Sequence, residues 1–117
     1  MAVNLVNVTT INRAKIYQGQ PGTSVGTLYT VPASTDVKIT SIVLCNTTAL
    51  PATVTLSVVT AAGTAGVTNQ IASALAINAN QLIVLDVPVY MSAADFIAGL
   101  QGTSSAITVT ISGETYA

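Results

Sequence analysis

The sequence predicts an all-β fold, namely a single-domain antiparallel β-sandwich, jelly-roll-like, built from eight to nine short strands. Two observations indicate this class. Short runs rich in Val, Ile and Thr recur along the whole chain, and turn signals containing Gly, Pro, Asn or Ser separate them about every 8–12 residues. An immunoglobulin-like sandwich is the main rival, but the chain has one Cys and no Trp and therefore lacks the Cys and Trp core of that fold.

The first third of the chain predicts three strands. Residues 2–10 alternate between apolar and polar side chains, with one slip between Leu5 and Val6 that indicates a bend or bulge. Residues 14–18 predict a short second strand, and the Gly- and Pro-rich segment that follows is a loop. Residues 27–31 predict a strand that stops at Pro32, because proline cannot donate a hydrogen bond to a ladder.

The middle of the chain predicts a pair of strands at residues 37–45 and 52–60. In the first, Val37, Ile39, Ser41, Val43 and Cys45 share one face, while the other face starts polar and becomes apolar. In the second, apolar residues at even positions from 54 to 58 are expected inward and the hydroxyl residues between them outward. A six-residue connection, 46–51, separates the strands, which predicts an antiparallel hairpin.

The last part of the chain predicts three further strands and one ambiguous segment. Residues 70–79 fit either a strand or a short helical stripe, and a strand or extended segment is favoured because the segment is short and is interpreted as uncapped. Residues 81–87, 96–100 and 106–112 predict strands, and residues 90–95 predict a turn.

The length and composition of the chain limit the number of domains and indicate what kind of surface the protein has. A chain of 117 residues has the size of one domain, here residues 1–117. Only 6% of its residues are charged, against about 25% in a typical protein, and the mean hydropathy is +0.68. Two interpretations remain open: a surface coated with uncharged polar residues, or a subunit that buries much of its surface against partners, which this composition favours.

The chemistry-bearing residues are few and scattered, which predicts a protein that is not an enzyme and has no catalytic, cofactor-binding or metal-binding residues. The chain contains no His, so its single Cys45 has no imidazole base and cannot complete a zinc site. Cys45 lies in an apolar run and is interpreted as a buried thiol. No two acids are placed close enough by the pattern to act as a catalytic pair.

Three of the four acidic residues and the aromatic residues also have a structural interpretation. Asp36 and Asp95 precede predicted strands, where a carboxylate accepts hydrogen bonds from backbone N–H groups. Asp86 lies in an apolar strand and is expected to face solvent, to pair with Lys38 or to lie at a subunit contact. The aromatic residues are interpreted as core or interface residues; they are Tyr17, Tyr29, Tyr90, Phe96 and Tyr116.

Nucleic acid and membranes are not expected partners. The three cationic residues make no basic patch, although Arg13 and Lys15 are two residues apart and are expected on one strand face. No apolar run approaches the length of a membrane helix, and nothing at the N-terminus resembles a signal peptide.

Several motifs resemble those of small virion proteins of tailed bacteriophages. The run LYTVPA at residues 28–33 is followed by a strand that ends in Cys45-Asn46-Thr47 and by TVTL at residues 53–56. Later segments, LIVLD at 82–86 and ITVTISG at 107–113, are also similar. The resemblance covers roughly residues 27–113, and it implies a head-decorating or tail-associated protein of the virion, assembled in the host cytoplasm.

Residue pattern and resemblance together predict a structural virion protein that decorates or cements a capsid through oligomeric contacts, with a homotrimer favoured. The expected partners are the major capsid protein or tail proteins. The alternative is a tail or tail-fibre module that contacts the host surface and binds carbohydrate through Tyr and Asn side chains. Residues 1–20 lie outside the resemblance and are expected to be an N-terminal strand of the sandwich or an arm that pairs with a neighbouring subunit.

Overall fold

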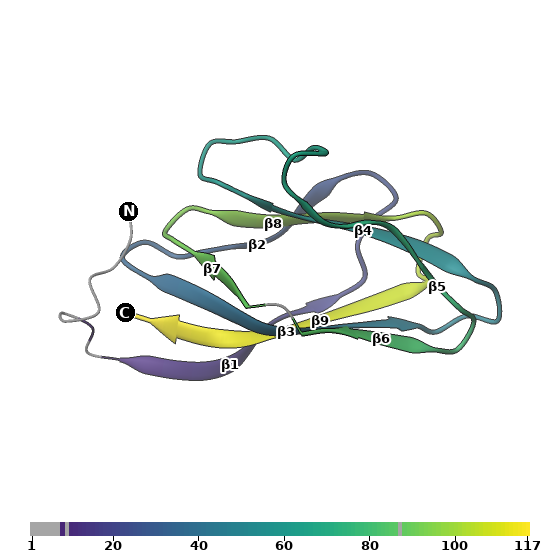
Figure 1. Cartoon of the computed structure of the whole chain (residues 1–117), viewed down its shortest axis with the longest axis horizontal. Helices are drawn as coiled ribbons and strands as arrows, with labels where there is room; N and C mark the ends of the chain where they lie inside the picture. The colour runs from purple at the N-terminus through teal and green to yellow at the C-terminus, as the bar shows by residue number, and fades with distance from the viewer. Residues whose placement is uncertain (1–7, 9, 87) are drawn as a thin grey trace.

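The computed structural model describes residues 8, 10–86 and 88–117, and all regular structure in them is β-strand (Figure 1). The predicted strand at residues 2–10 lies almost entirely outside the described residues. The strands are β1 (Ile11–Gly19), β2 (Gly26–Thr30), β3 (Asp36–Asn46), β4 (Ala52–Val59), β5 (Gln70–Ile77), β6 (Leu82–Leu85), β7 (Val89–Met91), β8 (Phe96–Gln101) and β9 (Ile107–Tyr116).

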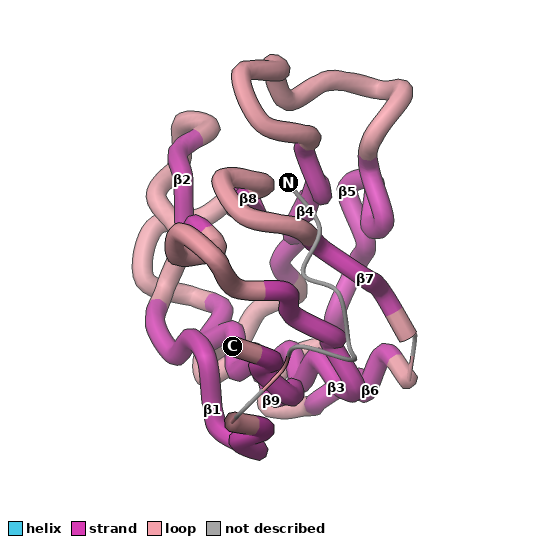
Figure 2. Tube along the Cα trace, turned by 90° about the vertical axis from the view of Figure 1, so that its left-hand side faces the viewer, coloured by secondary structure: helices cyan, strands magenta, loops and turns pink. Residues whose placement is uncertain are grey.

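The nine strands form two antiparallel sheets that pack face to face, as predicted. Sheet A has the order β1-β9-β3-β6, and β7 pairs with the other half of β3, so that β6 and β7 together fill one strand position. Sheet B has the order β2-β8-β4-β5. Figure 2 shows the two layers end-on, with β1, β9, β3 and β6 in sequence along the lower one. This interleaving of strands from both halves of the chain is the jelly-roll arrangement, which confirms the predicted fold class.

The predicted hairpin between residues 37–45 and 52–60 is wrong, because β3 belongs to sheet A and β4 to sheet B. The side chain of Asn46, only 1% exposed, holds the crossing between the sheets. Its Nδ2 donates to the carbonyls of Leu50 (2.7 Å) and Ile77 (3.1 Å), and its Oδ1 accepts from the backbone N–H of Thr48 (2.9 Å). Since these bonds lie inside the protein, the Asn46 amide replaces the ladder hydrogen bonds that a hairpin would have made.

A β-bulge at Thr40 explains why the apolar face of β3 changes along the strand. Ile39 lies opposite Gly113 of β9 and Ser41 opposite Ser112, which leaves Thr40 as an extra residue. One extra residue moves every later side chain to the opposite face. The buried positions therefore switch from odd to even numbers; they are Val37, Ile39, Ile42 and Leu44. The predicted single inward face of residues 37–45 holds only as far as the bulge.

The remaining elements agree with the predictions in type and differ at their ends. The ambiguous segment at 70–79 is β5, a strand as favoured. The predicted turn at 90–95 is shorter, because Tyr90 and Met91 belong to β7 and extend sheet A. β9 runs on to Tyr116, where it pairs with both β1 and β3.

The core lies between the sheets and consists mainly of Ile, Val and Leu side chains. Its fully buried members include Ile39, Ile42, Leu44, Leu56, Ile77, Met91, Ile97, Ile107 and Ile111. The polar side chain of Gln101, at the end of β8, is as buried as they are. Its Nε2 donates to the carbonyl of Pro21, and its Oε1 accepts from the N–H groups of Ala106 (3.2 Å) and Ile107 (2.7 Å). Gln101 thereby joins the loop before β2 to the loop before β9.

Candidate interaction surfaces

The titratable side chains that the structure describes are dispersed over the molecule. In the part of the chain that the structure describes, no three His, Cys, Asp or Glu residues are grouped closely enough to hold a metal ion, and no helix is long and apolar enough to span a membrane. Asp95 behaves as predicted, because its carboxylate accepts from the N–H groups of Ser92 and Ala61 at 2.9 Å each. Asp36 is the first residue of β3, opposite Tyr116, and Asp86 is exposed after β6.

Cys45 is half-buried and lies on the outer side of sheet A, so the prediction of a buried thiol is only partly met. Its neighbours Leu44 and Asn46 point into the core, and Cys45 itself lies opposite Leu82 of β6 and Thr108 of β9. The cause is the bulge at Thr40, which turns the last part of β3 over.

Charge is distributed very unequally between the two sheets. The chain has seven charged residues, three cationic and four acidic. Five of them lie on sheet A; they are Arg13, Lys15, Asp36, Lys38 and Glu114. None lies in β2, β4, β5 or β8, the four strands of sheet B. The molecule therefore has one sheet that carries ions and one that is neutral.

The outer face of sheet A carries a cross-strand row of alternating charge, which we call the charged row: Arg13, Glu114, Lys38 and Tyr90. These residues lie opposite one another on β1, β9, β3 and β7. Arg13 Nε donates to Glu114 Oε2 at 3.2 Å, and Lys38 Nζ lies 5.9 Å from the centre of the Tyr90 ring, a cation–π distance. Arg13 and Lys15 lie on one face of β1, as predicted, since they pair with Glu114 and Ser112 of β9.

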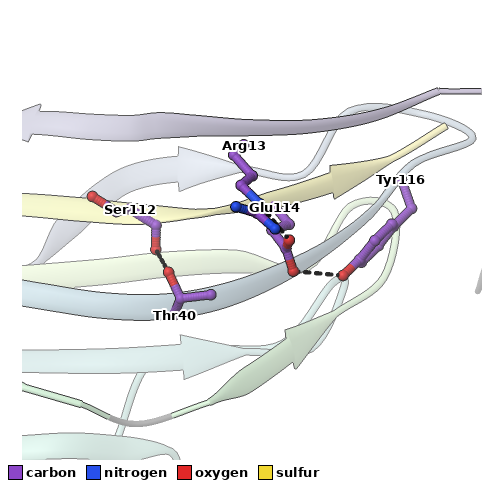
Figure 3. Close-up of polar contacts among 5 residues, drawn as sticks. All are labelled: Arg13, Thr40, Ser112, Glu114 and Tyr116. Carbon is purple, nitrogen blue, oxygen red and sulfur yellow. Dashed lines mark hydrogen bonds and ion pairs between the residues drawn. The ribbon is translucent and has the colours of Figure 1, made fainter.

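Glu114 is the centre of this row. It accepts a second hydrogen bond, 2.9 Å long, from the hydroxyl of Tyr116, and Figure 3 shows Arg13 and Tyr116 pointing to the same carboxylate. The Tyr116 hydrogen bond, followed by the contacts with Arg13, lowers the pKa of Glu114 below its ordinary value. The same bond raises the pKa of Tyr116, because ionised tyrosine would lose its donor and face a carboxylate. The pair therefore remains a charged acceptor and a neutral donor near neutral pH.

A shallow depression of about 480 Å³ opens beside the charged row. It is lined by Arg13, Ala14, Thr40, Ser112, Gly113 and Glu114. It forms where β1 and β3 both carry a bulge next to Ser112 of β9. Thr40 Oγ1 donates to the Ser112 carbonyl at 3.2 Å across its floor (Figure 3). With a guanidinium, a carboxylate and hydroxyls but no nucleophile paired with a base, this depression can form hydrogen bonds to a ligand but shows no catalytic arrangement.

The outer face of sheet B offers a different kind of surface. A smaller depression of about 220 Å³ is lined by uncharged residues, among them Val25, Thr55, Ser57, Gln70 and Leu100. Val25 is 57% exposed, and Val67, in the loop between β4 and β5, is 85% exposed. Sequence periodicity placed Thr55 and Ser57 outward, but it gave no signal that the whole sheet would be free of ions.

The tyrosines, predicted to be core or interface residues, divide between the core and the outer surface of sheet A. Tyr17 and Tyr29 are half-buried and pack against the core. Tyr90 is 72% exposed, and Tyr116 is half-buried beside Glu114. Tyr90 and Tyr116 therefore belong to the outer surface of sheet A and not to the core.

Comparison with known proteins supports the fold and not a family. No protein-family model matches the chain, and no curated protein sequence does. Among solved structures, the chain is similar to a protein of Bacillus endospore appendages, described as disulfide-linked pili, with a TM-score of 0.55 and 18% identity over 92% of this chain and 88% of that one. It is also similar to a protein of the infectious bursal disease virus T13 viral particle, with a TM-score of 0.55 and 11% identity over 92% of this chain, and to one of the Gx strain of that virus, with 0.52 and 14% over 92%. This chain spans only 30% and 32% of those two viral chains.

Proposed function

We propose that the chain is a non-enzymatic structural protein of a virion, which packs the neutral outer face of sheet B against other coat or tail proteins. The observation that carries this proposal is the absence of charged residues from all four strands of that sheet. Burying an ion without a partner costs several kcal/mol, and the cores of protein interfaces are accordingly depleted in charge. A freely dispersed domain normally shows charge on both faces.

The fold is compatible with this role. The similar structures come from a viral particle and from disulfide-linked pili. The likeness supports the jelly roll as a building block, and the sequence motifs add the finer proposal that the virion is that of a tailed bacteriophage. On that proposal the chain decorates the capsid as a homo-oligomer, with a trimer favoured, and holds neighbouring major capsid proteins together.

The direct test is to purify particles from the phage that carries the chain and to locate the chain on them by cryo-electron microscopy. We expect it on the head, with the outer face of sheet B toward the capsid. Recombinant Ala76→Asp, which places a carboxylate on the exposed outer side of β5, should bind capsids at least about tenfold more weakly than the parent chain. Thr103→Asp adds the same charge to an exposed loop and is the matched control. A chain that is absent from purified particles, or that binds equally well as Ala76→Asp, would contradict the proposal.

A second candidate function is a tail or tail-fibre module that binds carbohydrate at the host surface. The depression beside the charged row favours it, because the Arg13–Glu114 ion pair can bind sugar hydroxyls and the ring of Tyr116, which donates to Glu114, can contact a sugar face. A glycan array tests this function: binding that is lost in Arg13→Ala would support it, and an array without any binder would remove it.

The N-terminal segment is proposed to extend the contacts. β1 is part of the sandwich from Ile11 onward, and Thr10 and Ala117 exchange backbone hydrogen bonds of 3.0 and 2.9 Å. We propose that the N-terminal residues before β1, part of the predicted segment 1–20, contact a neighbouring subunit. Removing residues 2–8 should then weaken self-association but leave the melting temperature of the domain unchanged.

A further inference from the structure

Both edges of sheet A are free of a pairing strand among the residues that the structure describes, and they differ in charge. At one edge, β1 presents Arg13 and Lys15 on its outer face. At the other edge, β6 presents Leu82 and Val84, which are 58% and 53% exposed, and the exposed Asp86 follows directly. A sheet edge with unpaired backbone groups is a template for another strand.

Strand direction allows these two edges to join. β1 is antiparallel to β9, β9 to β3, and β3 to β6. β1 therefore runs opposite to β6. When a second copy is placed beside the first without being turned over, its β1 meets β6 of the first copy as an antiparallel neighbour, the geometry in which edge strands pair by backbone hydrogen bonds.

We propose that the chain self-associates head to tail, with β1 of one copy adding to β6 of the next and Lys15 lying near Asp86 of that copy. In this register the bulge at Ile16 keeps Gln18 on the outer face, opposite Val84. The aliphatic part of the Lys15 side chain then covers apolar surface while its ammonium group faces the carboxylate. The apolar contact and the charge pairing both use residues that are exposed in the single chain, namely Lys15 and Asp86.

The symmetric alternative at the β1 edge is less favourable. A two-fold pairing of β1 with β1 would bring the Arg13 and Lys15 side chains of two copies together, and like charges across a strand pair are destabilising. A head-to-tail contact is heterologous, so it closes into a ring or continues as a filament. The inference deepens the proposed structural role by naming the surfaces through which copies join, and a ring of three agrees with the trimer proposed above.

The test is a charge swap read out by light scattering after size exclusion over a dilution series. The wild-type chain should be oligomeric. Lys15→Asp and Asp86→Lys should each raise the apparent dissociation constant about tenfold, and the double variant should return it to nearly the wild-type value. Leu82→Lys, an exposed change that places a charge on the edge strand, should also weaken association, whereas Thr103→Asp should not. Circular dichroism melts establish that each variant is folded.

Two results would overturn the inference: a wild-type chain that is monomeric throughout, or single variants that dissociate while the double variant fails to recover. Neither result bears on capsid binding by sheet B, which is measured separately with Ala76→Asp. If Ala76→Asp binds capsids as well as the parent chain does, the proposed function is contradicted. The head-to-tail contact is still supported in that case, provided that the double variant of Lys15 and Asp86 recovers the association that each single variant loses.

Discussion

The buried amide of Gln101 gives the sharpest test of what holds the two halves of the chain together. Gln101→Leu keeps the size of the side chain but removes its three hydrogen bonds. The Pro21 carbonyl and the N–H groups of Ala106 and Ile107 belong to buried residues and would lose that partner. Each buried group left without a partner costs about 1–3 kcal/mol, and the added apolar burial returns about 1–2 kcal/mol. Three such groups cost about 3–9 kcal/mol together, so we expect the free energy of unfolding to fall by about 2–7 kcal/mol.

A loss of that size is large beside the stability of about 5–15 kcal/mol typical of a small domain. Chemical denaturation followed by circular dichroism should show a lower midpoint with an unchanged slope, and the melting temperature should fall by roughly 10–25 °C. The matched control is Gln20→Leu, since the exposed Gln20 also donates hydrogen bonds, at 3.2 Å to the Ser105 carbonyl and at 3.4 Å to Oγ1 of Thr108 in β9. It should cost no more than about 0.5 kcal/mol. If the free energies of unfolding of Gln101→Leu and Gln20→Leu differ by less than about 1 kcal/mol, the reasoning about Gln101 is refuted.

Three further changes test other parts of the structure. Tyr116→Phe removes the hydrogen bond to Glu114, so the pKa of Glu114, followed by carboxyl NMR, should rise toward its ordinary value. Gly113→Ala should lower stability by about 2 kcal/mol or more, because the new Cβ would collide with the backbone of β3 at the bulge, whereas Gly26→Ala meets nothing within 4 Å and should be nearly neutral. Ala94 adopts φ of 70°, a left-handed conformation that glycine tolerates better. Ala94→Gly should therefore increase the free energy of unfolding by up to about 1 kcal/mol and raise the melting temperature slightly.

The pH dependence of the Tyr116–Glu114 bond has a definite sign. The pKa of Glu114 is lower in the folded protein than in the unfolded chain. Its contribution to folding stability is therefore fully present above the unfolded pKa and is lost as the pH falls through the folded pKa. The pKa of Tyr116 is higher in the folded protein than in the unfolded chain. Its contribution to folding stability is therefore fully present below the unfolded pKa and is lost as the pH rises through the folded pKa. An unchanged Glu114 titration in Tyr116→Phe would show that the hydrogen bond does not set that pKa. An Ala94→Gly variant that is clearly less stable would show that backbone strain is not stored there.

Alternating side chains were enough to predict the strands and the fold class, but not how strands are shared between the sheets. The change of the apolar face along residues 37–45 was visible in the sequence, and the structure shows that Thr40 causes it as a bulge. A six-residue connection between two amphipathic strands fits a hairpin as well as a crossing. The hydrogen bonds of Asn46 decide between them, and these depend on Ile77, which is distant in sequence.

The charged row shows a similar limit. Arg13 and Lys15 could be placed on one face from their spacing, and register confirms this. The partner of Arg13, Glu114, is 101 residues further along the chain, and no local pattern connects them. Composition alone showed that charge was scarce. Only the sheet order shows that β2, β4, β5 and β8, which lack it, lie together in one sheet.

The neutrality of sheet B has an environmental consequence. A contact made by hydroxyl, amide and aliphatic groups of these strands contains no ionised side chain of sheet B, so it is little affected by screening from dissolved ions or by titration in mild acid. The affinity of a contact through sheet B would therefore depend little on ionic strength or on mildly acidic pH. Any contact through Arg13, Lys15 or Asp86 would instead loosen as ionic strength rises, so the two faces of one small domain would respond to different changes in their surroundings.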